Sequence, residues 1–353
     1  MADDQRPGRG RRPTLMDVAE HAGVSRATAS LVVRKSPLVS QTTRQRVEAA
    51  MAELGYVYNA GAARLRASRS RTVGVVVPNL TNPFFAVLIA GMEAVFETED
   101  LAVILANSNE DIAKQAGFLK RMREHAADGV IVCPCEGSDR RLVEDAAKWE
   151  LPLVQALRYV PETTSDYAGI DYREGMRDAT ERLIALGHRD ILFVSGNRRH
   201  SARFDRLAGF CAAMEAHGFD AGGVVELRLT HTAARAAAST ILDRQKRPSA
   251  LLCFNDVVAL GLHRGLLDLG LRLGRDVSLV GFDDVAEAAL VLPGLTSVAT
   301  RPFEVGENAA RLLLRRIHAP AAAIERRIVP TRYVERESTG PAPAALDHGL
   351  GLP

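Results

Sequence analysis

Apolar runs alternate with amphipathic stretches along most of this 353-residue chain, and this alternation constrains the fold more than any other feature. The runs rich in Val, Ile and Leu indicate buried strands at 72–77, 101–106, 129–133, 152–156, 191–195, 224–229, 250–254 and 277–281. The stretches with helical spacing are 83–98, 109–125, 139–148, 173–187, 201–217, 233–243 and 256–269. Because buried strands joined by helices form parallel sheets covered on both faces, the pattern predicts an α/β body of two doubly wound lobes.

A different pattern precedes the body. Residues 14–58 predict three short helices, with Thr14, Ser25 and Ser40 as N-caps whose hydroxyls accept from first-turn N–H groups. Gly23 permits a tight turn between the first two helices. A helix, a Gly-containing turn and a second helix form the unit that places its second helix in the DNA major groove. The segment therefore predicts a helix-turn-helix DNA-binding head.

Charge is distributed unevenly between these parts. Residues 1–71 hold 13 Arg and Lys against 6 Asp and Glu, a net charge of +7, whereas the remainder has a net charge of −5. A basic head on a mildly acidic body favours contact of the head alone with an anionic polymer. Residues 1–13 are rich in Gly, Pro and Arg, which predicts a disordered basic arm.

The head resembles the lactose-repressor (LacI) family of bacterial transcription regulators. The resemblance rests on D-V-A-x-x-A-G-V-S-x-x-T-x-S, followed by V-S-x-x-T-R-x-R-V and then by L-G-Y-x-x-N. It continues, less closely, to about residue 337. The segments A-S-L-V and R-S-R-T-V-G-V-V-V-P-N-L-T-N-P-F-F are most similar to the maltose-regulator (MalI) branch.

The family implies an effector-binding and dimerisation body of two periplasmic-binding-protein-like lobes in residues 72–337. The chain should return to the first lobe near 295–300 and cross back around 326–330. The tail, 338–353, is rich in Pro, Ala and Gly and is expected to be disordered. It lacks the tetramerising heptad helix found in some members, which favours a homodimer.

The resemblance places Arg26, Ala27 and Leu31 on the face of the second helix that meets the bases. Arg26 can donate two hydrogen bonds to guanine, whereas Ala27 and Leu31 can contact only thymine methyl groups. Two alternatives stay open, a phosphate contact for Arg26 and packing on the third helix for Leu31. The polar residues expected to cap the DNA-binding helices or to meet backbone phosphates are Thr14, Ser25, Thr28, Ser30, Ser40, Thr43 and Arg44.

Residues 59–71 are expected to link head and body, and Asn59-x-x-Ala62-Ala63-x-Leu65 resembles the family's hinge helix. Small residues at 62 and 63 would let two such helices pack closely in the minor groove, with Leu65 wedged between base pairs. A helix this short is unstable alone, so it should form only with partner and DNA present. The alternative is an ordinary linker whose leucine packs on the body.

Nine residues are expected to contact a small-molecule effector, because they follow strands or match the family's ligand positions. They are Asn79, Phe84, Phe85, Arg158, Asp171, His200, Arg206, Asn255 and Asp283. The two phenylalanines could instead belong to the core, and Asp283 could form an internal salt bridge. Where many members have an aspartate, this chain has Leu157 followed by Arg158, a departure that admits a ligand bearing a carboxylate or phosphate.

These features predict a sequence-specific transcriptional repressor, homodimeric on a palindromic DNA operator and controlled by a small molecule, most simply a sugar or sugar derivative. A sugar-transport protein would share the body but not the basic head. The chain has no G-x-S-x-G, P-loop, H-E-x-x-H or strand-linked G-x-G-x-x-G, so no enzyme activity and no cofactor are expected. Four cysteines without metal-like spacing and the lack of a signal peptide or membrane-length apolar run predict a cytoplasmic protein with reduced thiols.

Overall fold

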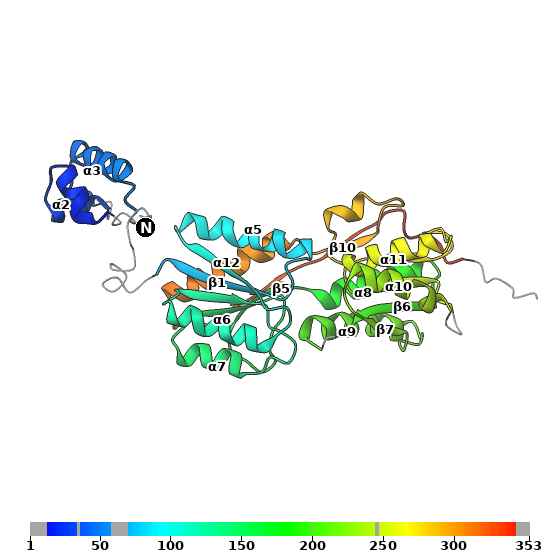
Figure 1. Cartoon of the computed structure of the whole chain (residues 1–353). Coiled ribbons are helices and arrows are strands. Elements are labelled where there is room, and N and C mark those ends of the chain that lie inside the picture. The colour runs from blue at the N-terminus through cyan, green and yellow to red at the C-terminus, as the bar shows by residue number, and fades with distance from the viewer. Residues whose placement is uncertain (1–12, 34–35, 58–69, 198, 244–246, 344–353) are drawn as a thin grey trace, which may run out of the picture. The chain divides into compact units, whose positions relative to one another are not determined.

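The computed structural model divides into two compact units, 1–68 and 69–353 (Figure 1). The residues that the structure describes are 13–33, 36–57, 70–197, 199–243 and 247–343. The predicted basic arm, apart from its last residue, and most of the predicted hinge segment lie outside them, so the expectations for Asn59, Ala62, Ala63 and Leu65 stay predictions.

The first unit contains the predicted helix-turn-helix. Its helices are α1 (Leu15–His21), α2 (Arg26–Val33) and α3 (Gln41–Leu54). They pack on a small core that includes Val18, Ala29 and Val47. Gly23 makes the tight turn with φ 62°, in the left-handed region that favours glycine.

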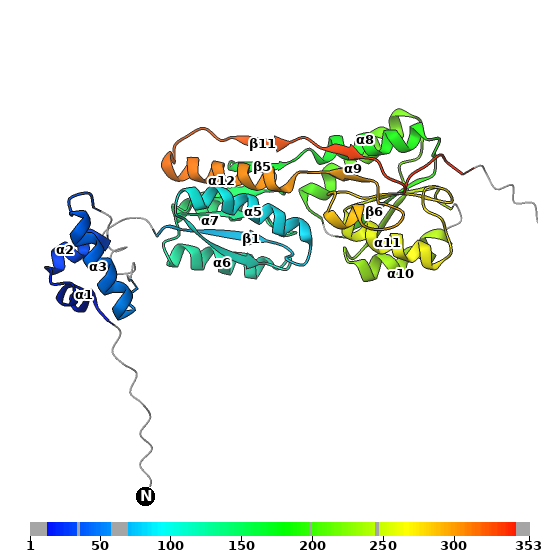
Figure 2. The same ribbon diagram turned by 90° about the horizontal axis from the view of Figure 1, so that it is seen from above.

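The first lobe of the second unit is built on a parallel sheet in the order β11-β5-β4-β3-β1-β2. Its described strands are β1 (Thr72–Val77), β2 (Ala102–Asn107), β3 (Gly129–Val132), β4 (Leu153–Ala156), β5 (Asp166–Ile170) and β11 (Arg326–Val329). One face is covered by α5 (Pro83–Thr98) and α12 (Pro302–His318), and the other by α6 (Ile112–Glu124) and α7 (Arg141–Lys148) (Figures 1 and 2). The inner strands are therefore buried on both faces, as predicted, whereas the edge strand β2, also predicted to be buried, is mostly exposed.

The second lobe repeats this plan with a smaller parallel sheet in the order β7-β6-β8-β9. Its described strands are β6 (Ile191–Gly196), β7 (Val224–Leu227), β8 (Ala250–Cys253) and β9 (Ser278–Val280). The helices are α8 (Tyr172–Ala185) and α9 (Ser201–Ala216) on one face, and α10 (His231–Leu242) and α11 (Asp256–Asp268) on the other (Figure 2). Two doubly wound lobes are thus confirmed.

Alternating side chains of the strands supply the two cores of the first lobe. In β1, Val73, Val75 and Val77 belong to the cluster that includes α5, whereas Val76 belongs to the cluster that includes α6. Helices α5 and α12 approach very closely at Gly306, where an added Cβ would lie 2.1 Å from the Leu88 carbonyl oxygen. Only glycine permits this approach.

The described chain crosses between the lobes three times, as Figure 2 shows. It leaves the first lobe after β5, returns at the start of α12, and leaves again after β11. Strands β10 (Ser297–Ala299) and β12 (Arg332–Val334) flank the last two crossings and pair antiparallel. The second and third crossings lie where the sequence predicted them.

The sequence prediction differs from the structure in several segments. Strands β10, β11 and β12 and helix α12 were not predicted, and β5 was predicted only as a strand of unstated bounds that ends at Asp171. The prediction that a disordered tail begins at residue 338 is wrong for 338–343, because Ser338 is fully buried and its Oγ donates to the Leu279 carbonyl at 2.6 Å. Among the described helices, none is both long and apolar enough to cross a membrane.

Candidate functional site

The exposed surface of α2 carries the predicted base-reading residues. Arg26 and Ala27 are exposed in its first turn, whereas Ala29 and Val32 face the core of the head. Leu31 is half-buried, so it both packs and remains partly accessible. The structure therefore presents Ala27 beside Arg26 on the exposed surface of α2, and their contact with bases stays a prediction.

The predicted phosphate-contacting residues mostly fasten the helices of the head. Thr14 caps α1 in a capping box with Asp17. The Ser25 hydroxyl accepts the Thr28 N–H at 3.1 Å, and the Ser40 hydroxyl accepts the Thr43 N–H at 3.3 Å. The predicted residues outside these caps are half-buried Ser30 and Arg44, whose guanidinium donates to the Ser36 carbonyl at 2.8 Å.

A polar cavity of about 510 Å³ lies between the two lobes of the second unit. Eight of the nine predicted effector residues line it, namely Asn79, Phe84, Phe85, Arg158, His200, Arg206, Asn255 and Asp283. They come from the carboxyl ends of strands and the first turns of the following helices, where parallel α/β sheets bind ligands. Asp171 is instead the N-cap of α8, and its carboxylate accepts the Glu174 N–H at 3.1 Å.

Arg206 and Asp283 form a buried pair on the second-lobe wall of the cavity. Arg206 is 4% exposed and its guanidinium lies 3.9 to 4.4 Å from the ring centres of Tyr172, Phe254 and Phe282. Its Nη2 lies 3.8 Å from the Asp283 carboxylate, too far for a hydrogen bond.

Burial also leaves this pair incompletely satisfied. The Arg206 Nε–H has no hydrogen-bond partner among the described atoms. Burial raises the pKa of Asp283 well above its ordinary value and lowers the pKa of Arg206. Arg206 and Asp283 thus line the cavity together without a hydrogen bond between them.

Arg158, on the first-lobe wall, behaves differently. Its Nη1 donates to both carboxylate oxygens of Glu110, at 2.8 and 3.0 Å, and to the Pro134 carbonyl at 3.2 Å. Glu110 is largely buried with it and also accepts the Glu136 N–H. The charge of Arg158 is therefore neutralised inside the protein, so Arg158 alone does not support an anionic ligand.

Several cavity residues hold unusual backbone conformations. Leu157 has φ 63°, Glu110 has φ 59° and Asp283 has φ 117°, all in the left-handed half of φ space that disfavours side chains. Such conformations cost free energy and persist where the surrounding structure enforces them, often at ligand sites. These three residues come from both walls of the cavity.

Hydrogen bonds beside the cavity connect the lobes directly. The Tyr159 N–H donates to the Ser201 hydroxyl at 2.9 Å, and the Tyr159 hydroxyl donates to Asp205 at 3.3 Å. The Arg199 N–H donates to the Glu136 carboxylate at 2.7 Å. A rotation of one lobe against the other would break these bonds.

The sequence analysis missed several residues of the cavity wall. They include Asn82, Asn107, Glu110, Cys133, Tyr172, Arg228 and Thr230. Most follow a strand or cap a helix, which was the available signal. Cys133 is one of the buried thiols, and burial raises its pKa to about 12, so it stays protonated.

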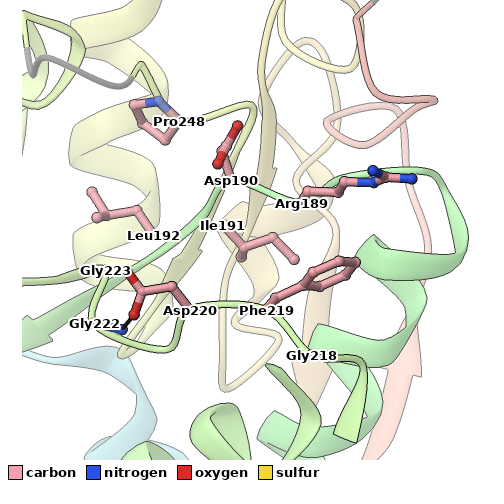
Figure 3. A pocket seen from close by; sticks show the side chains of 10 residues that line it. All are labelled: Arg189, Asp190, Ile191, Leu192, Gly218, Phe219, Asp220, Gly222, Gly223 and Pro248. Carbon is pink, nitrogen blue, oxygen red and sulfur yellow. Dashed lines mark hydrogen bonds between the residues drawn. The ribbon is translucent and has the colours of Figure 1, made fainter. Parts of the chain in front are cut away.

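A larger pocket, of about 680 Å³, lies at the opposite, amino-terminal ends of the second-lobe strands (Figure 3). Its Asp220 carboxylate folds back to accept the Gly222 N–H at 2.8 Å. Arg189 lies over the ring of Phe219 at 5.9 Å. Because ligands of such sheets bind at the carboxyl ends of strands, the cleft between the lobes is the better candidate despite its smaller volume.

Comparison with known proteins agrees with this architecture. Residues 14–59 match the family described as bacterial regulatory proteins, lacI family, and residues 180–339 match the periplasmic binding protein-like domain. The chain is 35% identical over 308 residues to the HTH-type transcriptional repressor PurR of Vibrio campbellii, with 86% of this chain and 92% of that protein covered.

Solved structures give the same result. The complex of the transcriptional regulator CelR with cellobiose is 32% identical, with a TM-score of 0.70, and covers 93% of this chain and 100% of its own. The Lac repressor dimer bound to operator and the anti-inducer ONPF is 26% identical, with a TM-score of 0.84, and covers 94% of this chain and 100% of its own. The chain has a helix-turn-helix head and two α/β lobes, and it is 35% identical to the PurR repressor of Vibrio campbellii over most of both chains. It therefore belongs to the lacI family of bacterial regulatory proteins.

Proposed function

We propose that this protein is a cytoplasmic, sequence-specific DNA-binding repressor whose operator affinity is controlled by a small molecule in the cleft between its lobes. The observation that carries the proposal is the Arg206–Asp283 pair, which lines the cavity with a donor and an acceptor that do not bond each other. Buried polar groups need partners, and a ligand can supply them.

The chemistry of this wall suits a sugar or sugar derivative. One hydroxyl group can accept a hydrogen bond from Arg206 and donate one to Asp283 at the same time. Phe84 and Phe85 line the cavity from the first turn of α5, although they are only 5% and 8% exposed. Their rings can contact the apolar face of a sugar. The placement in the maltose-regulator branch stays a prediction, since the relatives named above are PurR and CelR.

Ligand and DNA are coupled in this proposal through the relative position of the lobes. A ligand that bonds both walls favours one arrangement over another by its difference in affinity. Rotation would break or remake the bonds of Tyr159 and Glu136 to the second lobe. The linkers to two heads would carry this change to a two-fold symmetric operator.

A second copy of the chain is the proposed partner on the edge of the first-lobe sheet. Strand β2 lies at this edge, and its Ile104 and Leu105 are 38% and 40% exposed. Val87 of α5 is also exposed. An uncovered edge strand with apolar side chains invites pairing or burial, so we assign this surface to the homodimer.

The experiment that tests the proposal is selection of bound sequences from a random DNA pool by the full-length chain, with and without a panel of sugars and sugar phosphates. The expected result is enrichment of a palindrome whose retention changes with one class of compound. Enrichment of no symmetric site would contradict the proposed operator binding.

Arg26→Ala is expected to weaken binding to the selected operator by about 1–3 kcal/mol, because Arg26 is the exposed residue of α2 able to pair with guanine. The measurement is a titration of operator and of random DNA at fixed salt. An equal loss on both DNAs would assign Arg26 to a phosphate instead.

A further inference from the structure

Several asparagines of the cavity wall have their side-chain oxygens occupied by backbone N–H groups of the protein. Four of the described asparagines that line the cavity each use the side-chain oxygen to accept a backbone N–H. The pairs are Asn79 with Thr81 at 2.9 Å, Asn82 with Phe84 at 3.1 Å, Asn107 with Asn109 at 3.2 Å, and Asn255 with Val258 at 3.1 Å. Because an amide has one oxygen and one NH₂ group, these contacts leave the NH₂ groups to donate.

Arg206 adds a further donor. It is 4% exposed, lines the cavity, and has an Nε–H without a hydrogen-bond partner among the described atoms. Its guanidinium can therefore donate to a ligand.

The carboxylate acceptors on the wall are fewer. Glu110 is occupied by Arg158 and by a backbone N–H, which leaves the Asp283 carboxylate as the acidic group open to a ligand in the described lining. The lining contains three arginines and two acidic residues, an excess of one positive charge. Arg158 and Arg206 each face an acid, and the excess lies at Arg228, which is exposed at the end of β7.

Helix ends increase this positive potential. Helices α5, α9, α10 and α11 have their N-caps at Asn82, His200, Thr230 and Asn255, all in the cavity lining. A helix N-terminus carries a partial positive charge that attracts anions. The unpartnered Arg206 Nε–H points independently to a ligand with acceptor atoms.

We propose that the effector is an anionic hydroxylated compound, a sugar or polyol bearing a phosphate or a carboxylate. Its hydroxyls contact Arg206 and Asp283, and its anionic group pairs with Arg228. The inference rests on the proposed function only in taking this cleft as the effector site. It assigns the anion not to Arg158, whose presence in the sequence only admitted an anionic ligand, but to the arginine whose charge no described acid neutralises.

Calorimetric titration of the full chain with matched ligands tests the inference. The probes are glucose with glucose 6-phosphate, ribose with ribose 5-phosphate, gluconate, and inorganic phosphate. At least one sugar phosphate or gluconate should bind about tenfold or more tightly than its neutral counterpart. Arg228→Gln should weaken that ligand by about 10- to 100-fold, the range for a hydrogen bond to a charged group, and leave the neutral counterpart unchanged.

The matched control is Arg189→Gln, which removes an exposed arginine at the opposite end of the second-lobe sheet and should change neither affinity. Arg228→Lys should retain part of the preference. Tighter binding of neutral sugars, no binding of any anionic probe, or a preference that survives Arg228→Gln would overturn the inference. Comparison of the sugar phosphates with gluconate shows whether the anionic group is a phosphate or a carboxylate.

The same ligands, added to the operator complex, separate this inference from the proposed function. An anionic ligand that binds through Arg228 without changing operator affinity would support an anion site in the cleft and contradict the proposed control of DNA binding. A neutral sugar that alone binds the cleft and changes operator affinity would do the reverse.

Discussion

Arg206→Met is expected to abolish ligand binding in the cleft and to lower the free energy of unfolding by about 3–5 kcal/mol, the usual cost of removing one partner of a buried ion pair. Methionine keeps the apolar length of the side chain among Tyr172, Phe254 and Phe282. It leaves Asp283, which is 7% exposed, without its cation. Urea unfolding and calorimetric titration of the full chain measure the two effects.

The double variant Arg206→Met with Asp283→Asn separates these effects. It should regain most of the stability, because no charge is left buried, while ligand binding stays lost. In the single variant the deficit should be smallest at low pH, where Asp283 is protonated with or without Arg206. Because burial already raises the pKa of Asp283, the deficit should grow as pH rises through that pKa. Equal stability of the single and double variants would contradict this account.

Asp166→Ala is expected to destabilise the first lobe by about 3–5 kcal/mol while leaving affinity for cleft ligands intact. Asp166 is 1% exposed at the start of β5. Its carboxylate accepts from Arg315 at 3.2 Å, from Arg316 at 2.8 Å and from the Glu325 N–H at 2.8 Å. The substitution leaves Arg316 without an acid and Arg315 with only Glu325, at 3.4 Å, and urea unfolding measures the loss.

A control for Asp166→Ala lies on the same helix, α12. Glu307 pairs with Arg311 at 3.0 Å one helical turn away, with both side chains partly exposed. Glu307→Gln should cost only about 0.3–0.5 kcal/mol, as for other exposed pairs on helices. A similar small loss for Asp166→Ala would show that its buried network adds little to stability.

Helices and strands could be predicted from the sequence where residues that start or end the element lie next to it in the chain. Strand β1 and helix α5 were predicted to the residue, because a valine-rich run is followed by Asn82 as cap and Pro83 at the helix start. The bounds of strand β5 were not predicted, because it begins with a buried aspartate whose partners Arg315 and Arg316 are about 150 residues away. No local pattern contains that contact.

Helix α12 shows the same limit. Val305, Ala309 and Leu312 have helical spacing, but Gly306 weakens the pattern. The value of this glycine appears only in the fold, where α12 contacts the Leu88 carbonyl of α5.

Eight residues of the cavity could be predicted from the sequence, because ligands of parallel α/β sheets bind at the carboxyl ends of strands and chain topology alone places these residues there. The same reasoning misassigned Asp171, because a strand-end acid can equally cap the next helix. It also could not show that Glu110 neutralises Arg158, since that pair joins two loops 48 residues apart. Arg228 belongs to no sequence motif, and its role could be inferred only from the charges that line the cavity.

The three crossings also determine the order in which the lobes can be completed during synthesis. The second-lobe sheet and its four helices come from the continuous stretch 172–280. The first-lobe sheet gains its edge strand β11 and the cover of α12 only after residue 300. On the ribosome, where chains emerge amino end first, the middle of this protein can therefore mature before its beginning, and early translation products expose an unfinished sheet that chaperones would recognise.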